Sequence, residues 1–482
     1  MNIELEEKYS PQQVAAFIRL IDPNFPDPSE EQSLIISIKS NPLEPAVVIA
    51  GAGSGKTETM ASRVVYLVAN GFVRPDQILG LTFTRKAAGE LNLRIRKRLG
   101  QLLKGMEKAH IAAYNAPFEP PFRSLDTAVT TYHSYAGRIL SEHSIRLGID
   151  ADSQPMGEAA LWMMANRIVR NWDEAGYTNE SSIKTIIEDL MGLTSQALEH
   201  QVSGDAIIEQ DNKLLAELNR MSGPSNEGVR KAALTAVQRS GLVAMMERFL
   251  EERRTSGQLS FDDQISLAAR IAQNFPDVGA LERSKYPVVL LDEYQDTSHS
   301  QVRLLSTLFS HGHAVTAVGD PCQSIYTWRG AAAGTIGAFN NYFPKNDGST
   351  GAKQYNLSRT YRNDISILEV ANVISEGVRT SDGVEVLPLS ARIGAGKGEL
   401  TCGIYENLEA EGLAIAEYFK PLWLENEVLR KDPGKKPRTF AVLVRKKSQI
   451  AVIQEALTAA DIPSEVLGLG GLIHVPEVAD IV

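Results

Sequence analysis

The feature that most constrains this 482-residue sequence is a glycine-rich segment between a short apolar run and a helical pattern. The run Ala46–Ala50 is apolar and β-branched, as expected of a strand buried inside a sheet. Residues 50–57 then read Ala-Gly-Ala-Gly-Ser-Gly-Lys-Thr, and helical spacing continues from Lys56 to Asn70. Glycine lets backbone N–H groups approach phosphate oxygens closely, and a helix N-terminus favours anions. The segment therefore predicts a phosphate-binding loop.

The last two residues of this loop have the side chains that nucleotide chemistry requires. Lys56 would reach the β- and γ-phosphates, and the Thr57 hydroxyl would bind Mg²⁺. A turn without a ligand is the alternative, and the strict pattern has glycine where this chain has Ala50. The strand before the loop and the helix after it argue against that alternative. The predicted nucleotide-binding residues are Ala50, Gly51, Ala52, Gly53, Ser54, Gly55, Lys56 and Thr57.

A second apolar run ends in a pair of carboxylates. Residues 288–291 are Val-Val-Leu-Leu, and Asp292 and Glu293 follow directly. Asp292 would hold Mg²⁺ through water, and Glu293 would orient or deprotonate an attacking water. A strand that ends in solvated acids is the alternative for this pair alone. Beside a phosphate-binding loop, the pair predicts hydrolysis of a nucleoside triphosphate.

The composition of the chain limits the cellular compartment and the classes of binding partner that we expect. Two cysteines, a polar acidic start and the lack of an apolar run long enough for a bilayer predict a cytoplasmic protein with no membrane partner. The net charge of −10 taken alone argues against nucleic-acid binding. However, residues 85–108 hold eight basic and two acidic side chains, and residues 430–447 hold eight and one. These local clusters are large enough for phosphate contacts, so the overall charge does not exclude nucleic acid.

The order of strand and helix signals predicts an α/β fold of several domains. The first hundred residues alternate strand and helix signals, which predicts a parallel sheet. Residues 115–122 are rich in proline and predict a linker or surface loop. Residues 156–254 are almost wholly helical, and strand signals return at 286–291 and 314–318, which predicts one α/β domain interrupted by a helical insertion. A second α/β stretch is expected from about Gln354, with strands at 398–404 and 438–444.

Seven separated motifs resemble those of the UvrD/Rep family of superfamily 1 DNA helicases and occur in that family's order. The resemblance extends over essentially the whole chain. Beside the phosphate loop and the Asp-Glu pair, the most distinctive reads Val-Gly-Asp-Pro-Cys-Gln-Ser-Ile-Tyr-Thr-Trp-Arg-Gly-Ala. The motifs carrying the resemblance occupy residues 29–32, 81–88, 131–134, 259–263, 291–297, 318–331 and 357–362.

The resemblance implies a fold and a set of nucleotide contacts. The fold would be two RecA-like P-loop NTPase domains, 1A (1–103 and 259–345) and an incomplete 2A (346–482), with a helical 1B insertion (104–258) in the first. ATP and Mg²⁺ would be the cofactors. Gln32 would read the adenine, Tyr361 would stack on it, and Gln323 would sense the γ-phosphate. Arg362 would bring positive charge to that phosphate from the second domain. The implied catalytic residues are Lys56, Asp292, Glu293, Gln323 and Arg362.

The resemblance also implies a path for single-stranded DNA. Flat aromatic side chains suit such a path because any base can stack on them. For each aromatic residue taken singly, a place in the core is the more common outcome. The implied DNA-binding residues are Thr82, Phe83, His133, Phe261, Tyr326, Trp328 and Arg329.

The implied function is that of an ATP-dependent DNA helicase that translocates 3′ to 5′ on single strands and acts at single/double-strand junctions in repair or recombination. Two late motifs of the family, which would supply a second arginine for the γ-phosphate, are missing from these residues. The sequence is therefore expected to be an N-terminal portion, which alone could lack catalysis. Three alternatives stay open: a motor subunit of an AdnAB-type helicase–nuclease with a second subunit, a non-catalytic DNA-binding scaffold subunit, and an ATPase that acts on protein.

Overall fold

The computed structural model describes most of the chain in two compact units, Met1–Gly398 and Glu399–Val482. The second unit is described only as far as residue 467. The described residues are 7–38, 44–149, 156–173, 181–220, 226–257, 261–310, 312–326, 331, 334–345, 351–379, 384–432 and 434–467, without the side chains of 261 and 262.

A parallel sheet forms the centre of the first unit. Among the described residues it has six strands in the order β3-β2-β4-β5-β1-β6. All neighbouring strands run parallel. Strands β1, β2, β4 and β5 are buried along their whole length, which is why they read as continuous apolar runs. The strands are β1 (Ala46–Ala50), β2 (Ile78–Thr82), β3 (Ala128–Thr131), β4 (Val288–Leu291), β5 (Ala314–Gly319) and β6 (Lys353–Leu357).

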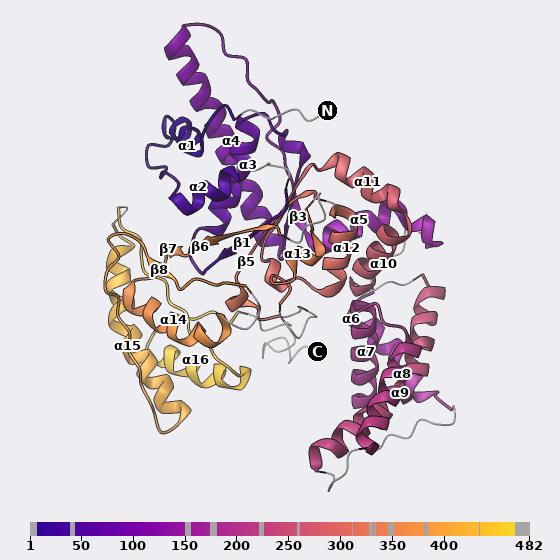
Figure 1. Cartoon of the computed structure of the whole chain (residues 1–482). Coiled ribbons are helices and arrows are strands. Elements are labelled where there is room, and N and C mark those ends of the chain that lie inside the picture. The colour runs from indigo at the N-terminus through magenta and orange to yellow at the C-terminus, as the bar shows by residue number, and fades with distance from the viewer. Residues whose placement is uncertain are drawn as a thin grey trace. The chain divides into compact units, whose positions relative to one another are not determined.

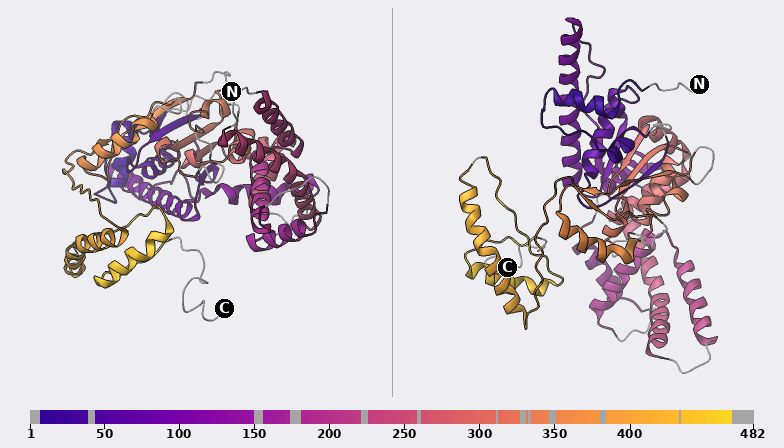
Figure 2. Two further views of the ribbon diagram at one scale, coloured as in Figure 1. Left: turned by 90° about the horizontal axis from the view of Figure 1, so that it is seen from below. Right: turned by 60° about the vertical axis from the view of Figure 1, so that its left-hand side comes forward.

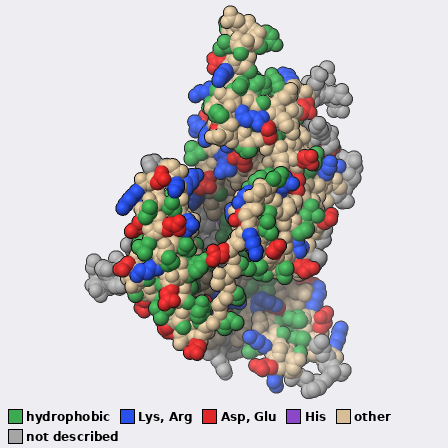
Figure 3. Space-filling view, turned by 90° about the vertical axis from the view of Figure 1, so that its left-hand side faces the viewer, with side chains coloured by type: hydrophobic (Ala, Val, Ile, Leu, Met, Phe, Trp, Pro, Cys, Tyr) green, Lys and Arg blue, Asp and Glu red, His purple; other side chains and the backbone are tan. Residues whose placement is uncertain are grey.

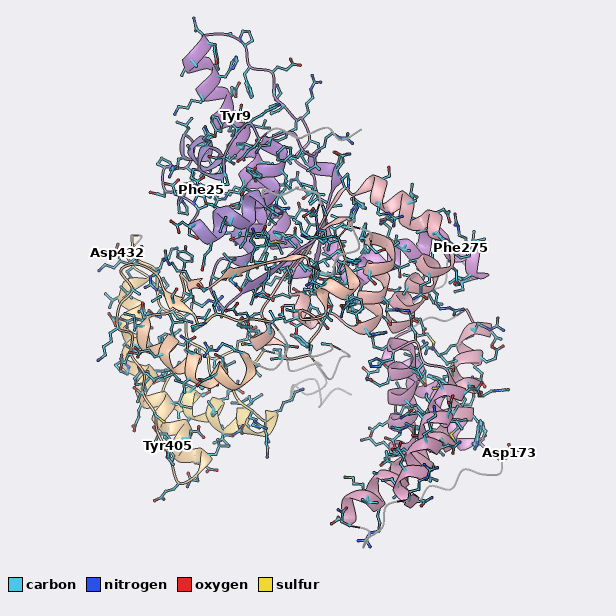
Figure 4. All side chains as sticks on the ribbon, in the orientation of Figure 1. Tyr9, Phe25, Asp173, Phe275, Tyr405 and Asp432 are labelled. Carbon is cyan, nitrogen blue, oxygen red and sulfur yellow. The ribbon has the colours of Figure 1, made fainter. Side chains whose placement is uncertain are left out.

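Helices cover both faces of this sheet, and alternate strand residues contribute to two separate cores (Figure 1). One core includes Val48 of β1, and the other includes its neighbour Val47. Figure 4 shows Phe25 on the first side and Phe275 on the second. The first side holds α1 (Pro11–Arg19), α2 (Glu30–Ser37), α3 (Lys56–Ala69) and α4 (Arg85–Tyr114). The second side holds α5 (Tyr132–His143), α10 (Phe261–Asn274), α11 (Pro276–Lys285), α12 (His299–Phe309) and α13 (Phe339–Tyr342).

A helical insertion separates α5 from α10 in the sequence. Its helices run side by side as a bundle (Figure 2) with a core of their own. The contacts that connect it to the sheet domain include a buried ion pair between Arg253 and Asp263 and a hydrogen bond from Ser300 N–H to Glu199 Oε1 at 2.8 Å. The insertion consists of α6 (Glu158–Arg170), α7 (Ile183–Glu199), α8 (Gly204–Arg220) and α9 (Glu227–Thr255).

The predicted insertion boundary at residue 104 differs from this arrangement. Helix α4 continues unbroken through that position, and β3 and α5 then return to the sheet domain. The proline-rich stretch at 115–122 is thus a loop within the domain, because β3 hydrogen-bonds to β2 as soon as the chain returns.

The predicted start of the second domain at residue 346 would assign the next strand, β6, to that domain, but β6 belongs to the first sheet. Strand β6 pairs with β1 in the first sheet, from Ala46 opposite Lys353 to Ala50 opposite Leu357. After β6, the short strands β7 (Arg359–Thr360) and β8 (Ser390–Ala391) pair with each other, and α14 (Ile365–Arg379) lies between them in sequence. The compact first unit ends at Gly398.

The second unit contains α15 (Leu408–Leu429) and α16 (Ile450–Ala459), which pack around a small core that includes Ala416 and Leu457. Its described residues form no β-strand, so the strands predicted at 398–404 and 438–444 are not found. A strand requires a hydrogen-bonded neighbour. At Arg438 the Asn426 side chain instead bonds both the backbone N–H and the carbonyl, each at 2.7 Å.

Within the part of the chain that the structure describes, every helix is too short or too polar to span a bilayer.

The packing of α1 against α4 predicts opposite effects for two glycine substitutions in one helix. A Cβ at Gly105 would lie 1.9 Å from the Phe17 carbonyl oxygen, whereas a Cβ at Gly89 would meet nothing within 4 Å. We expect Gly105→Ala to lower the free energy of unfolding by about 1–3 kcal/mol through overpacking. Gly89→Ala should raise it by about 0.5–1 kcal/mol through helix propensity. Urea unfolding of both variants checks this, and an equal stabilisation by both would contradict the close backbone approach.

Candidate functional site

The predicted site residues gather at one edge of the sheet because the carboxyl ends of parallel strands meet there. The phosphate loop follows β1, Phe83 follows β2, Asp292 follows β4 and Asp320 follows β5. The backbone connects neighbouring segments at this edge, since Asp292 N–H donates to the Leu81 carbonyl at 2.9 Å.

The phosphate loop bends through two glycines in left-handed conformation, Gly53 at φ +76° and Gly55 at φ +86°. Such angles strain residues that carry a Cβ. The loop is held from the side of β6, because Gly51 N–H donates to the Leu357 carbonyl at 3.2 Å and Tyr361 N–H donates to the Gly53 carbonyl at 2.8 Å. The Ser54 hydroxyl is buried without a hydrogen-bond partner. The loop therefore presents the start of α3 as the predicted anion site.

Lys56 and Glu293 form an ion pair across this edge, with 3.0 Å between Nζ and Oε2. The Glu293 side chain is 36% exposed and that of Lys56 is 13% exposed. Burial raises the pKa of Glu293, but the charge of Lys56 and the hydrogen bonds from Gln295 and Lys56 outweigh it and hold the pKa below its ordinary value. Glu293 is therefore ionised at neutral pH, as an acceptor of a proton from water must be.

Asp292 lies beside this pair and is buried. Burial, reinforced by the Glu293 carboxylate, raises the pKa of Asp292 to about 6, although Lys56 and the Glu293 backbone N–H oppose the shift. A buried carboxylate that resists ionisation is a group that a cation would stabilise. With the Thr57 hydroxyl it offers the oxygen donors that Mg²⁺ prefers, the remaining positions being water and phosphate. The residues present thus fit a Mg²⁺ site. Among the described residues no group of three or more His, Cys, Asp or Glu could hold a metal by itself.

Gln32 has a structural role that the sequence analysis did not foresee. It forms a capping box with Ser29: Ser29 N–H donates to Gln32 Oε1 at 3.0 Å, and Gln32 N–H donates to Ser29 Oγ at 3.2 Å. Its amide nitrogen lies beside the phosphate loop, 3.2 Å from where a Cβ of Gly55 would stand. The structure therefore brings Gln32 to the loop with its amide oxygen engaged in the capping box.

Tyr361 and Arg362 lie directly against the phosphate loop. The Tyr361 side chain is exposed, and a Cβ at Gly53 would stand 2.5 Å from Arg362 Cβ. Arg362 was predicted to come from the second domain, but it follows β6 of the first sheet after only four residues. Glu31, a residue that the sequence analysis missed, holds this segment by accepting hydrogen bonds from Ser358 N–H at 3.1 Å and Ser358 Oγ at 2.6 Å.

Gln323 lines a cavity of about 350 Å³ together with Gly51 and Ala52 of the phosphate loop. Its amide nitrogen donates to Asp320 Oδ2 at 2.5 Å. Much of the remaining lining comes from the end of β6 and from α14, including Asn356 and Arg379, and Leu389 contributes from the segment before β8. Gln323 is thus close to the loop, as predicted for a sensor of bound phosphate.

The predicted DNA-binding residues divide into three groups. Phe83 and Tyr326 stack on each other, with 4.9 Å between ring centroids and 28° between planes. Thr82 is fully buried and its hydroxyl donates to the Thr84 carbonyl at 3.1 Å, so this side chain does not face the surface, whereas His133 is half-buried. Trp328, Arg329 and the side chain of Phe261 lie outside what the structure describes.

Two further residues, to which the sequence analysis gave no role, fix the surroundings of the site. Arg63 of α3 is fully buried, and its Nη1 donates to the carbonyls of Ile35 and Ile36 at 3.3 and 3.1 Å, which ties α3 to the helix bearing Gln32. Burial lowers the pKa of Arg63 to about 10. Gln295 contacts Glu293 and Asp320. The contacts of Arg63 with Ile35 and Ile36 and of Gln295 with Asp320 join residues 25–28 positions apart, so they depend on the packed fold.

Comparison with known proteins identifies the lineage of the chain. The family model described as the UvrD/REP helicase N-terminal domain matches residues 30–344. The ATP-dependent DNA helicase UvrD1 of Mycobacterium leprae is 28% identical over 436 residues, which are 88% of this chain and 48% of that protein. The ATP-dependent DNA helicase PcrA of Leuconostoc citreum is 28% identical over 438 residues, 91% of this chain and 50% of that protein. The chain therefore spans about half the length of these relatives.

The contact between the phosphate loop and the segment after β6 predicts that Gly53→Ala weakens nucleotide binding. Its Cβ would lie 2.7 Å from Thr360 Oγ1 and push the two segments apart. We expect at least a roughly tenfold rise in the dissociation constant of a fluorescent ATP analogue. Gly71→Ala is the matched control, because Gly71 has nearly the same φ of +74° but nothing within 4 Å of its Cβ position. Equal affinities for both variants would contradict a role for this contact in nucleotide binding.

Proposed function

This chain belongs to the UvrD/Rep helicase family, and on that premise we propose that it is an ATP-driven DNA motor. The motor translocates 3′ to 5′ on single-stranded DNA and separates strands at single/double-strand junctions. DNA repair or recombination is the process in which we place it. The relatives described above are named as ATP-dependent DNA helicases, which supports this class of activity.

The observation that carries the proposal is the juxtaposition of two kinds of site at one sheet edge. The Lys56–Glu293 ion pair follows β1 and β4, and the stacked rings of Phe83 and Tyr326 follow β2 and β5. A nucleotide at the phosphate loop and a base against the aromatic rings would thus be held by adjacent segments of one rigid sheet. This adjacency favours a DNA motor over an ATPase that acts on protein.

Each residue of the proposed hydrolytic site has a role that follows from its charge and its position. Lys56 and Arg362 place positive charge at the β- and γ-phosphates, while Glu293 accepts a hydrogen bond from the attacking water and takes its proton. Thr57 and Asp292 would hold Mg²⁺, which when bound neutralises charge that develops on the phosphate oxygens. Intact groups of this kind favour a catalytic chain over a non-catalytic scaffold subunit.

Basic side chains near the aromatic pair would contact the DNA backbone. Arg94 and Arg98 of α4 are engaged by Glu58, at 3.2 and 3.0 Å, so part of this predicted basic cluster is neutralised within the fold. Lys86 and Lys97 are exposed and remain for phosphate contacts. On the described surface that faces the viewer in Figure 3, Lys and Arg side chains are interspersed with Asp and Glu. Contacts to DNA are thus expected from single side chains.

The removal of one charge tests the proposed activity. We expect Lys56→Ala to reduce DNA-stimulated ATP turnover of the full-length protein at least roughly 100-fold, because a preorganised charge on the transferred phosphate is lost. Lys345→Ala is the control, since Lys345 pairs with Glu44 at 3.9 Å elsewhere in the same unit. A coupled ATPase assay with and without oligo-dT measures the effect, and unwinding of duplexes with a 3′ or a 5′ tail reports the polarity.

Two results would contradict the proposal. One is wild-type turnover that single-stranded DNA does not stimulate, and the other is unchanged turnover in Lys56→Ala.

The aromatic pair tests the proposed DNA path. A base that stacks on an aromatic ring gains about 1–3 kcal/mol, so Phe83→Ala should weaken oligo-dT binding roughly 5- to 150-fold. Tyr114→Ala, at the far end of α4, removes a ring that is 72% exposed and should leave the affinity unchanged. Fluorescence anisotropy without nucleotide measures both variants. If the two bind DNA equally well, the path does not run along Phe83.

A further inference from the structure

Gln295 occupies a buried position between the proposed catalytic carboxylate and the segment that follows β5. It is 4% exposed and lies in a short 3₁₀ turn, Tyr294–Asp296. Its side-chain nitrogen donates to Glu293 Oε2 at 2.9 Å and to Asp296 Oδ2 at 3.2 Å, and its side-chain oxygen accepts from Asp320 N–H at 3.0 Å. Both polar atoms of this amide therefore have partners: the nitrogen donates to two carboxylates, and the oxygen accepts from a backbone N–H.

Glu293 depends on Gln295 for its orientation, because its other hydrogen-bond partner, Lys56, would also bind the phosphates of a nucleotide. Glu293 Oε2 accepts hydrogen bonds from both Lys56 Nζ and Gln295 Nε2. A nucleotide at the phosphate loop would draw the Lys56 ammonium towards its phosphates. The amide of Gln295 has no phosphate to approach from its buried position, so it keeps hold of the carboxylate when the ammonium is shared.

The other end of Gln295 is tied to the segment that leads to the aromatic pair. Ser324 Oγ donates to the backbone carbonyl of Gln295 at 3.3 Å, and Gln323 Nε2 donates to Asp320 Oδ2. The approach is close enough to require glycine at position 319, because a Cβ there would lie 2.4 Å from Gln295 Oε1. Two residues beyond Ser324, Tyr326 stacks on Phe83. A displacement of residues 320–324 would thus change the hydrogen bond from Asp320 N–H to Gln295 Oε1.

We propose that Gln295 is a positioning residue that sets the orientation of Glu293 according to the position of residues 320–324, and so links hydrolysis to the DNA-facing aromatic pair. This inference rests on the proposed function. Gln295 touches neither nucleotide nor DNA; it acts through Glu293 and through the Asp320 backbone. Its side chain works as a rigid spacer, because one planar amide joins the two segments directly.

Replacement of Gln295 by an apolar side chain of similar length separates this role from nucleotide binding. In full-length Gln295→Met we expect KM for ATP within about twofold of wild type and a fall of roughly 10- to 100-fold in kcat with saturating oligo-dT, since misplacement of a reacting group by about 1 Å costs that much. The ratio of kcat with DNA to kcat without DNA should approach one. Gln295→Glu keeps an acceptor for Asp320 N–H but loses the donor to Glu293, and we expect it to lose turnover as well.

Gln301→Met is the matched control, because Gln301 is also 4% exposed and also follows β4, but its side-chain oxygen accepts from Ser298 N–H in the capping box of α12. It should lose thermal stability without a change in the DNA-stimulation ratio. Ser324→Ala, which removes the part-buried hydrogen bond to the backbone carbonyl of Gln295, keeps the inference testable if Gln295→Met does not fold, and should lower the ratio severalfold.

The outcomes distinguish this inference from the proposed function. If DNA stimulates the wild type and stimulates Gln295→Met and Ser324→Ala to the same extent, the positioning role is refuted and the motor stands. If DNA does not stimulate the wild type, the proposed function fails, and the link to DNA fails with it. A lowered ratio in Gln295→Met with unchanged KM, against an unchanged ratio in Gln301→Met, supports the inference.

Discussion

The parallel direction of the strands is the constraint on which the rest of this structure depends. Because β1, β2, β4 and β5 all run the same way, the four segments that follow them emerge at one edge. Residues as distant in sequence as Lys56 and Glu293 then meet at 3.0 Å. The strands can be parallel only if helices cover both faces, and α1–α4 and α5 with α10–α13 do so.

Electrostatics at this edge follow from the exclusion of water. Asp292 is buried and its pKa rises to about 6, whereas the neighbouring Glu293 has a lowered pKa because Lys56 and Gln295 hold its charged form. Two adjacent carboxylates therefore have different properties, one suited to a cation and the other to a proton from water. Burial and the neighbouring side chains make that difference: the charge of Lys56 is the largest influence that lowers the pKa of Glu293, and the hydrogen bond from Gln295 adds to it.

Local sequence patterns predicted the elements that local physics decides. The glycines of the phosphate loop, the apolar runs of β1 and β4 and the helix after Lys56 are found where they were expected. Boundaries set by long-range pairing were not predictable in this way. The assignment of β6 to the second domain was wrong because a strand belongs to the sheet that bonds it, and β6 bonds β1. Likewise, β3 belongs to the sheet domain because it bonds β2, and α5 packs on the same sheet. The strands expected at 398–404 and 438–444 have no strand partner among the described residues.

The sequence by itself determined the chemical inventory of this protein: a glycine loop ending in Lys56 and Thr57, paired carboxylates after an apolar strand, and aromatic residues beside basic ones. Periodicity and residue type suffice for these because each is written within a few neighbouring positions. Only the tertiary structure decided which of them meet. It brought Glu31 to the segment after β6, placed the amide nitrogen of Gln32 beside the phosphate loop and buried Thr82. It also placed Gln295 between Glu293 and Asp320. Hydrogen bonds between residues far apart in sequence form only when packing excludes water from them, and packing is a property of the whole fold.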